Sequence, residues 1–84
     1  MYELVYADTA IKQLAKLEKE FQERIRNTLE RCRIRPHDYA KRLVGSPYYS
    51  LRAGDYRIIL KIEDQQLEIL VIEIGHRRNI YTHL

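Results

Sequence analysis

Two apolar runs in the second half of the chain constrain its fold more than any other feature. Residues 56–62 (YRIILKI) and 67–74 (LEILVIEI) are rich in β-branched and aromatic residues, which favour strands. The polar residues 63–66 between them are few enough to connect an antiparallel hairpin. A third run, residues 48–52, precedes a turn that contains Gly54, and a glycine suits a tight turn with positive φ. The sequence therefore predicts a meander of three antiparallel strands.

Alternation assigns the two faces of this meander, because successive side chains of a strand point to opposite sides. In residues 56–62, one face is apolar and can cover a core, and it consists of Tyr56, Ile58, Leu60 and Ile62. Arg57 lies on the other face, with Ile59 and Lys61. In the preceding strand, Arg52 shares a face with Ser50, opposite Tyr49 and Leu51. We therefore expect the cations of the meander to gather on one exposed face.

The N-terminal part of the chain predicts a short strand followed by helix. Residues 2–6 alternate as a strand does, and Asp8 and Thr9 both offer side-chain oxygens for the N-cap of a helix. Apolar residues then recur every three or four positions, as in an amphipathic helix: Ile11, Leu14, Leu17 (or Ala15), Phe21, Ile25, Leu29 and Cys32.

Residues 9–33 contain no proline or glycine, so the pattern alone allows either one long helix or an antiparallel pair. A single helix of about 25 residues would be about 38 Å long, which is long for a domain of this size. We therefore expect two helices with a break near residues 18–20. Pro36 disfavours helix for the residue before it, so residues 35–40 are expected to end the helical region.

The predicted order of elements is typical of an α+β protein. An N-terminal strand and two helices pack on a mostly antiparallel sheet, and the helices cover one face and leave the other available. The 84 residues show no repeat, no low-complexity segment and no sign of a second domain, so we expect a single domain over residues 1–84.

Composition excludes several classes of site. The one cysteine, Cys32, cannot form an internal disulfide and is expected to be a buried apolar residue of a protein in a reducing compartment. The first residues lack a basic segment followed by a long apolar stretch, so neither a signal peptide nor a membrane span is expected, and the predicted location is the cytoplasm. Three histidines and one cysteine show no ligand spacing, so we expect no metal and no cofactor.

The basic residues are concentrated in the middle of the chain. The net charge is only +3, but residues 24–57 hold nine Lys or Arg against three Asp or Glu. Arginine dominates there, which suits bidentate recognition of phosphate. A polyanion or an acidic protein segment is therefore the expected partner.

Three segments together resemble a known protein family. They are residues 41–45 (KRLVG), 49–58 (YSLRAGDYRI) and 75–81 (GHRRNIY), and they are similar to motifs of the RelE/ParE superfamily of toxins from type II toxin–antitoxin systems. The resemblance covers nearly the whole chain and implies a compact fold like that of microbial ribonucleases. For the RelE branch it implies cleavage of messenger RNA in the ribosomal A site, and for the ParE branch it implies poisoning of DNA gyrase. The ending at residues 75–81 is more similar to the RelE branch.

The chemistry of the matching residues is compatible with an RNase that needs no metal. A ribose 2′-hydroxyl attacks the neighbouring phosphorus, and guanidinium groups can stabilise the extra negative charge on the phosphoryl oxygens. The resemblance implies a catalytic role for Arg57 and Arg77, and for Tyr81 either base stacking or proton transfer. The expected RNA contacts are Arg52, Lys41, Arg42 and His76.

One position departs from the RelE pattern. RelE-type proteins often have a basic residue where this chain has Ser50, so the general base is left open, with His76 and His83 as candidates by their chemistry. A gyrase poison and a catalytically inactive binding module therefore remain as alternatives. In each case the family implies a cognate antitoxin with an acidic wrapping segment in a toxin–antitoxin hetero-oligomer, besides ribosome and mRNA for the RNase and no membrane.

Overall fold

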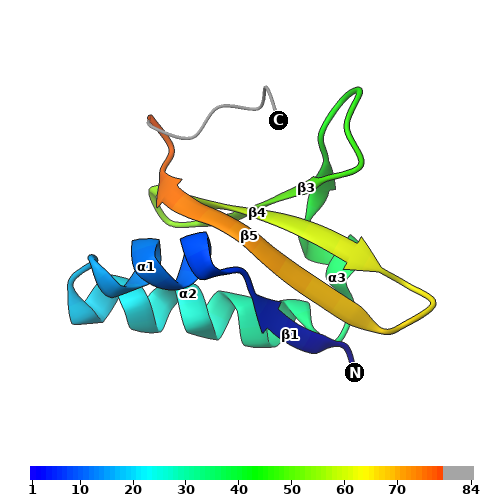
Figure 1. The fold of residues 1–84 in the computed structure, drawn as a ribbon, viewed down its shortest axis with the longest axis horizontal. Coiled ribbons are helices and arrows are strands. Elements are labelled where there is room, and N and C mark those ends of the chain that lie inside the picture. The colour runs from blue at the N-terminus through cyan, green and yellow to red at the C-terminus, as the bar shows by residue number, and fades with distance from the viewer. Residues whose placement is uncertain (79–84) are drawn as a thin grey trace.

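The computed structural model describes residues 1–78, and these form one sheet with helices on one side of it (Figure 1). The elements follow one another as β1 (Glu3–Tyr6), α1 (Asp8–Ala15), α2 (Lys19–Cys32), α3 (Pro36–Tyr39), β2 (Lys41–Arg42), β3 (Tyr49–Ala53), β4 (Tyr56–Glu63) and β5 (Glu68–His76). The predicted α+β class is therefore confirmed.

The sheet has five strands within the described residues, in the order β1-β5-β4-β3-β2. Strands β3 to β5 pair antiparallel, as the meander pattern predicts, and the short strand β2, which the pattern did not predict, pairs antiparallel with β3. β1 pairs parallel with β5, because the chain crosses the face of the sheet through α1 and α2 before it returns to form the meander. The expectation of a mostly antiparallel sheet is thus confirmed.

The main core lies between the helices and the sheet, as alternation predicts. Ile58 and Leu60 of β4 are fully buried there, and Ile25 and Leu29 of α2 meet them from the helical layer. At about 25 cal/mol per Å² of apolar surface, such buried side chains contribute the largest favourable term to folding. Tyr56, on the face predicted to cover a core, packs against this cluster, and so does Tyr49 of β3.

The opposite face of the sheet carries a smaller apolar cluster. Leu43 and Ile59 are buried there, with Tyr48 and Ile72 packed against them. The pairing of β4 with β5 is irregular at this point, because Ile59 lies opposite Glu73 and Leu60 lies opposite Val71. Ile72 is therefore the extra residue of a β-bulge. This cluster anchors the start of the β2–β3 loop to the sheet.

The helical segment consists of two helices, as expected, with the break at residues 16–18. The N-cap prediction was wrong: Ala7 is the cap of α1, no side chain caps it, and its carbonyl accepts the N–H of Ile11 at 3.0 Å. Asp8 is instead in the first turn, where a carboxylate still interacts favourably with the positive end of the helix. Ile11 is 52% exposed and Ala10 is buried in its place, so the predicted apolar stripe of α1 was wrong at Ile11, although Leu14 is buried as predicted.

Residues 35–40 do not simply end the helical region. Pro36 starts the short helix α3, which fits the preference of proline for the first helical position, where no N–H is needed. Residues after α3 form β2, which pairs with the start of β3. Gly54 has φ of +60° in the β3–β4 turn, as predicted from its position. Within residues 1–78, no helix is long and apolar enough to cross a membrane.

A candidate nucleic-acid interface on the open face of the sheet

Five of the seven predicted site residues line one open pocket of about 330 Å³, which we call the cationic pocket. Its walls are Lys41, Arg42, Arg52, Arg57 and Arg77, with Tyr39, Leu43 and Ser50 between them. These side chains come from α3, β2, β3, β4 and the residue after β5. The structure therefore brings together cations that are far apart in the sequence.

Strand register explains why these cations meet. Arg52 and Arg57 are direct partners across β3 and β4, and Gly75 of β5 lies on the other side of Arg57. Gly75 has no side chain, so no β5 side chain lies directly opposite Arg57 at this position. Lys41 is brought alongside by its pairing with Ser50, and the Arg77 N–H donates to the carbonyl of Asp55 at 2.9 Å.

The charges of the pocket are not neutralised by other described residues. Within residues 1–78, no carboxylate oxygen lies within 4.0 Å of a side-chain nitrogen of the five pocket cations. The ion pairs of Arg or Lys lie elsewhere, as Arg33–Glu30, Arg35–Asp38 and Lys61–Glu63. Several uncompensated cations around a hollow create a positive potential that attracts an anionic ligand.

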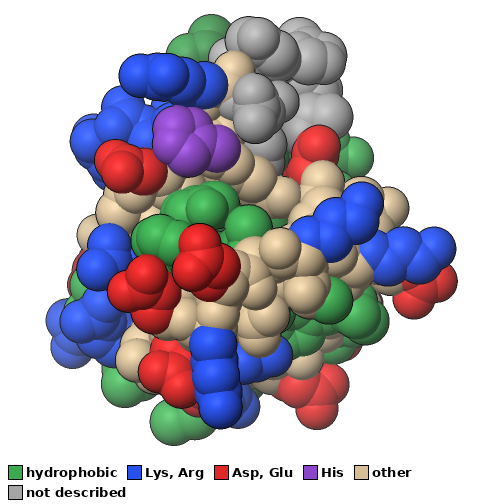
Figure 2. All heavy atoms as spheres, turned by 90° about the vertical axis from the view of Figure 1, so that its left-hand side faces the viewer, with side chains coloured by type: hydrophobic (Ala, Val, Ile, Leu, Met, Phe, Trp, Pro, Cys, Tyr) green, Lys and Arg blue, Asp and Glu red, His purple; other side chains and the backbone are tan. Residues whose placement is uncertain are grey.

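His76 lies in a neighbouring hollow rather than in the cationic pocket. This second hollow of about 570 Å³ is lined by Asp55, Arg57, His76, Arg77 and Arg78, so it shares two arginines with the first. Figure 2 shows this end of the molecule, where a histidine lies beside basic side chains and an acidic one.

The ring of His76 contacts Tyr56 edge-on, with 5.7 Å between ring centroids, and its Nδ1 accepts the N–H of Arg78 at 3.2 Å. His76 is paired with Tyr56 in the sheet, one position from Arg57, so its side chain starts on the helix-covered face. Tyr81 and His83 lie outside the described residues, and their roles stay predictions.

Tyr39 is a pocket residue that the sequence reasoning missed. It is the last residue of α3, it is 53% exposed, and it lines the cationic pocket beside Lys41 and Arg42. An exposed aromatic ring next to phosphate-binding cations can stack on a nucleobase. Its position two residues before the basic pair Lys41-Arg42 was the signal that could have pointed to it.

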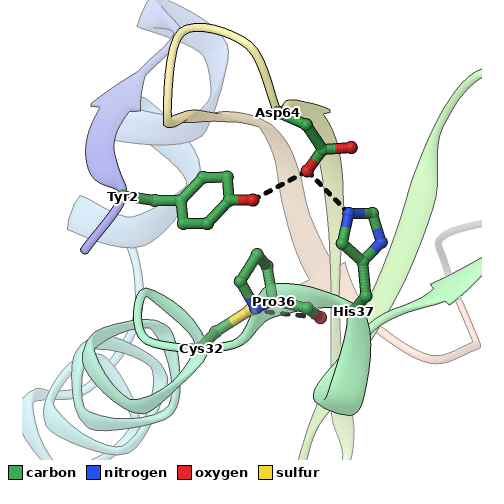
Figure 3. A network of polar contacts seen from close by, with 5 residues as sticks. All are labelled: Tyr2, Cys32, Pro36, His37 and Asp64. Carbon is green, nitrogen blue, oxygen red and sulfur yellow. Dashed lines mark hydrogen bonds and ion pairs between the residues drawn. The ribbon is translucent and has the colours of Figure 1, made fainter.

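The sequence pattern also did not predict a polar network of Tyr2, His37 and Asp64 on another part of the surface (Figure 3). The Asp64 carboxylate accepts the Tyr2 hydroxyl at 2.8 Å and His37 Nε2 at 2.7 Å. These hydrogen bonds, that of His37 above all, lower the pKa of Asp64. The network joins the N-terminal segment, α3 and the β4–β5 turn. It therefore helps to hold α3 in place, and α3 directly precedes β2 in the chain.

Cys32 packs in the core beneath this network, and its Sγ lies 4.0 Å from the carbonyl oxygen of Pro36. Burial raises the pKa of the Cys32 thiol to about 11. Its expected role as a buried apolar residue is thus confirmed. Among residues 1–78, no group of three or more His, Cys, Asp or Glu could hold a metal ion.

Comparisons with known proteins agree with the geometry. A family model described as the ParE toxin of a type II toxin–antitoxin system matches residues 4–81. A protein of Escherichia coli described as a RelE-like toxin is 30% identical over 79 residues, which cover 90% of this chain and 83% of that protein.

Solved structures show the same fold. A chain of the intact E. coli RelBE toxin–antitoxin complex is 28% identical with a TM-score of 0.79, over 90% of this chain and 96% of that one. A chain of the Mycobacterium tuberculosis RelBE2 complex has a TM-score of 0.81 at 23% identity, over 90% and 98% of the two chains. The family match at residues 4–81 begins within β1 and extends past the end of β5, and the chain therefore belongs to the RelE/ParE superfamily of toxins of type II toxin–antitoxin systems.

Proposed function

We propose that this toxin is a ribosome-dependent endoribonuclease that cleaves mRNA without a metal ion and so inhibits translation in the cytoplasm. The observation that carries the proposal is the convergence of Lys41, Arg42, Arg52, Arg57 and Arg77 on one open pocket. Cations without carboxylate partners are suited to the phosphodiester backbone of RNA.

The chemistry requires stabilisation of charge at one phosphate. The 2′-oxygen of a ribose forms a bond to the adjacent phosphorus, and the bond to the 5′-oxygen of the next nucleotide breaks. Arg57 and Arg77 stabilise the negative charge that develops on the phosphoryl oxygens, and Arg52, the cross-strand partner of Arg57, contacts a neighbouring phosphate. Lys41 and Arg42, on the outermost strand, contact the backbone of ribosomal RNA.

Proton transfer requires a group that the cations do not supply. Ser50 lies in the pocket wall, where its hydroxyl can donate a hydrogen bond but is too weak a base to take the 2′-proton at neutral pH. Tyr81 is the proposed proton-transfer or base-stacking group, and His76 binds the substrate from the neighbouring hollow.

Primer extension on a defined mRNA in a translating extract tests the proposal. The unaltered protein should cut within ribosome-occupied codons, and the cuts should weaken by about 100-fold or more in Arg57→Ala and in Arg77→Ala. Arg35→Ala is the matched control, because it removes an exposed cation that pairs with Asp38 outside the pocket. Intact mRNA with the unaltered protein would overturn the proposal.

Two other functions are alternatives, and each is supported by one observation. The family model that matches residues 4–81 is that of a ParE toxin, which favours DNA gyrase as an alternative target. That function predicts trapped DNA cleavage complexes with untouched mRNA. Ser50, at a position where RelE-type proteins often have a basic residue, favours an inactive antitoxin-binding module, which predicts no growth arrest on expression.

A cognate antitoxin is the proposed partner, because the similar structures include RelB–RelE complexes from E. coli and Methanococcus jannaschii. An acidic segment of that antitoxin would cover the cationic pocket in a hetero-oligomer. Co-expression of the antitoxin should then relieve growth arrest, and a peptide of its acidic segment should compete with RNA for the pocket.

A further inference from the structure

A second cationic groove lies on the α2 side of the cationic pocket, and we call it the helix groove. It has a volume of about 570 Å³ and is lined by Arg24, Thr28 and Arg31 of α2, by Tyr39, and by Leu51, Arg52, Ala53 and Gly54 of β3 and its turn. Arg24 and Arg31 are seven residues apart, about two helical turns, so they lie on the same side of α2.

The helix groove is continuous with the cationic pocket. Arg52 and Tyr39 line both hollows, so each forms part of the wall between them. β2 pairs with β3 only at Tyr49 and Ser50, and within the described residues no strand continues this pairing along Leu51–Ala53. The edge of β3 at Leu51–Ala53 therefore has no strand partner among the described residues.

Arg24 is seated against the β3–β4 turn by the absence of a side chain at Gly54. A Cβ at Gly54 would lie 2.8 Å from Nη1 of Arg24, which is closer than real contacts allow. The Thr28 hydroxyl donates to the Arg24 carbonyl at 2.8 Å in the same turn of α2. Arg24 thus presents its guanidinium at the rim of the groove.

The arginines of the helix groove have no carboxylate partner among residues 1–78. Glu30, next to Arg31 in the sequence, pairs with Arg33 at 2.8 Å. Asp38, next to Tyr39, lies 3.9 Å from Arg35. Two of the acidic side chains adjacent to groove residues in sequence are therefore directed to other cations, and Glu23 and Asp55, next to Arg24 and Gly54, form no ion pair within residues 1–78.

We infer that Arg24, Arg31 and Tyr39 form an RNA-binding track that extends the cationic pocket, with the guanidiniums on backbone phosphates and the Tyr39 ring on a base. This inference rests on the proposed function, because it assigns the same RNA ligand to the adjoining groove. Arginines interleaved with an exposed tyrosine favour nucleic acid over an acidic peptide. The track determines affinity for RNA, whereas the reacting phosphate lies at Arg57 and Arg77.

Equilibrium binding, measured apart from cleavage, tests the track. The probes are a single-stranded RNA oligonucleotide with 2′-O-methyl riboses, which cannot be cleaved by 2′-oxygen attack, and purified ribosomes. The test variant is Arg24→Gln with Arg31→Gln, and the control is Lys12→Gln with Lys16→Gln, which removes the same charge from exposed residues of α1 and its end. Thermal melting of both variants establishes that each is folded.

The test variant should bind the oligonucleotide about tenfold more weakly than the control at moderate salt. Its slope of log K against log salt should fall by about 1.4, the release expected for two single-strand phosphate contacts. Tyr39→Leu should weaken binding with no change in that slope. Weakened binding to the oligonucleotide identifies the message as the ligand, and weakened binding to ribosomes alone identifies ribosomal RNA.

Equal affinity of the test and control variants for both probes, with equal salt slopes, would overturn the inference, even if the unaltered protein cuts mRNA. So would a test variant that binds RNA normally but has lost affinity for an acidic antitoxin peptide. Conversely, RNA binding that depends on Arg24 and Arg31 in a protein that leaves mRNA intact would support the track and contradict the RNase.

Discussion

Arg52 and Arg57 are direct partners across β3 and β4, so two guanidinium groups extend from neighbouring positions on the same face of the sheet. Like charges at opposed positions of an antiparallel pair destabilise a sheet. Neither arginine has a carboxylate within 4.0 Å in residues 1–78. The two arginines therefore favour binding of an anion but lower the stability of the fold.

We expect Arg52→Gln to raise the free energy of unfolding while it lowers RNA affinity. Removing one of two opposed like charges should stabilise the fold by about 0.2–1 kcal/mol at low salt, and less at high salt because ions screen the repulsion. Urea unfolding at two salt concentrations measures this. Arg35→Gln, at an exposed position that pairs with Asp38, should not stabilise. Destabilisation by Arg52→Gln would contradict the account.

Alanine at Gly54 and at Gly45 should have similar effects on stability but different effects on binding. Both glycines have positive φ, +60° and +73°, so alanine should cost about 1–2 kcal/mol at each. At Gly45 no atom lies within 4 Å of the added Cβ, whereas at Gly54 it meets the flexible end of Arg24. Gly54→Ala should therefore displace Arg24 and weaken RNA binding as well.

Thermal melting and RNA binding of these two glycine variants provide the measurement. Gly45→Ala serves as the control for backbone strain alone. Equal RNA affinity in the two variants would show that Arg24 does not depend on its seat against Gly54.

Asp64→Asn should destabilise the protein near neutral pH and have little effect in acid. The pKa of Asp64 in the folded protein is lowered by its hydrogen bonds to His37 and Tyr2. Its stabilising contribution is therefore complete above the unfolded value of about 3.9 and is lost as pH falls through the lower folded value. Melting temperatures of both proteins from neutral to strongly acidic pH should converge.

The control for this pH series is Asp38→Asn, whose partner Arg35 is 3.9 Å away and exposed. It should change the melting temperature little at any pH. A difference between the unaltered protein and Asp64→Asn that persists unchanged into strong acid would contradict the role of the carboxylate.

Cys32 should resist alkylation in the folded protein. Its side chain is fully buried, and burial raises the pKa of the thiol to about 11, so little thiolate is present at pH 8. Iodoacetamide should modify it slowly in native buffer and rapidly in urea, with mass spectrometry as the readout. Rapid and complete modification of the folded protein would contradict this burial.

The strands of the meander and their faces were predictable because alternation is a local property. Ile58 and Leu60 are buried as their spacing predicts, and Arg57 lies on the opposite face. The break between α1 and α2 was predictable from length alone. The cap at Ala7 and the exposure of Ile11 were not, because the rotation of α1 depends on how the helix packs on β5.

The sequence by itself determined the α+β class, the apolar face of each meander strand and the supply of arginines for the open face. Only the tertiary structure decided which cations meet, because register and strand order arise from pairing between distant segments. That pairing sets Arg52 opposite Arg57, brings Lys41 beside Ser50, and makes Tyr39 a common wall of two hollows. It also separates His76 from the cationic pocket, although His76 and Arg77 are adjacent in the chain.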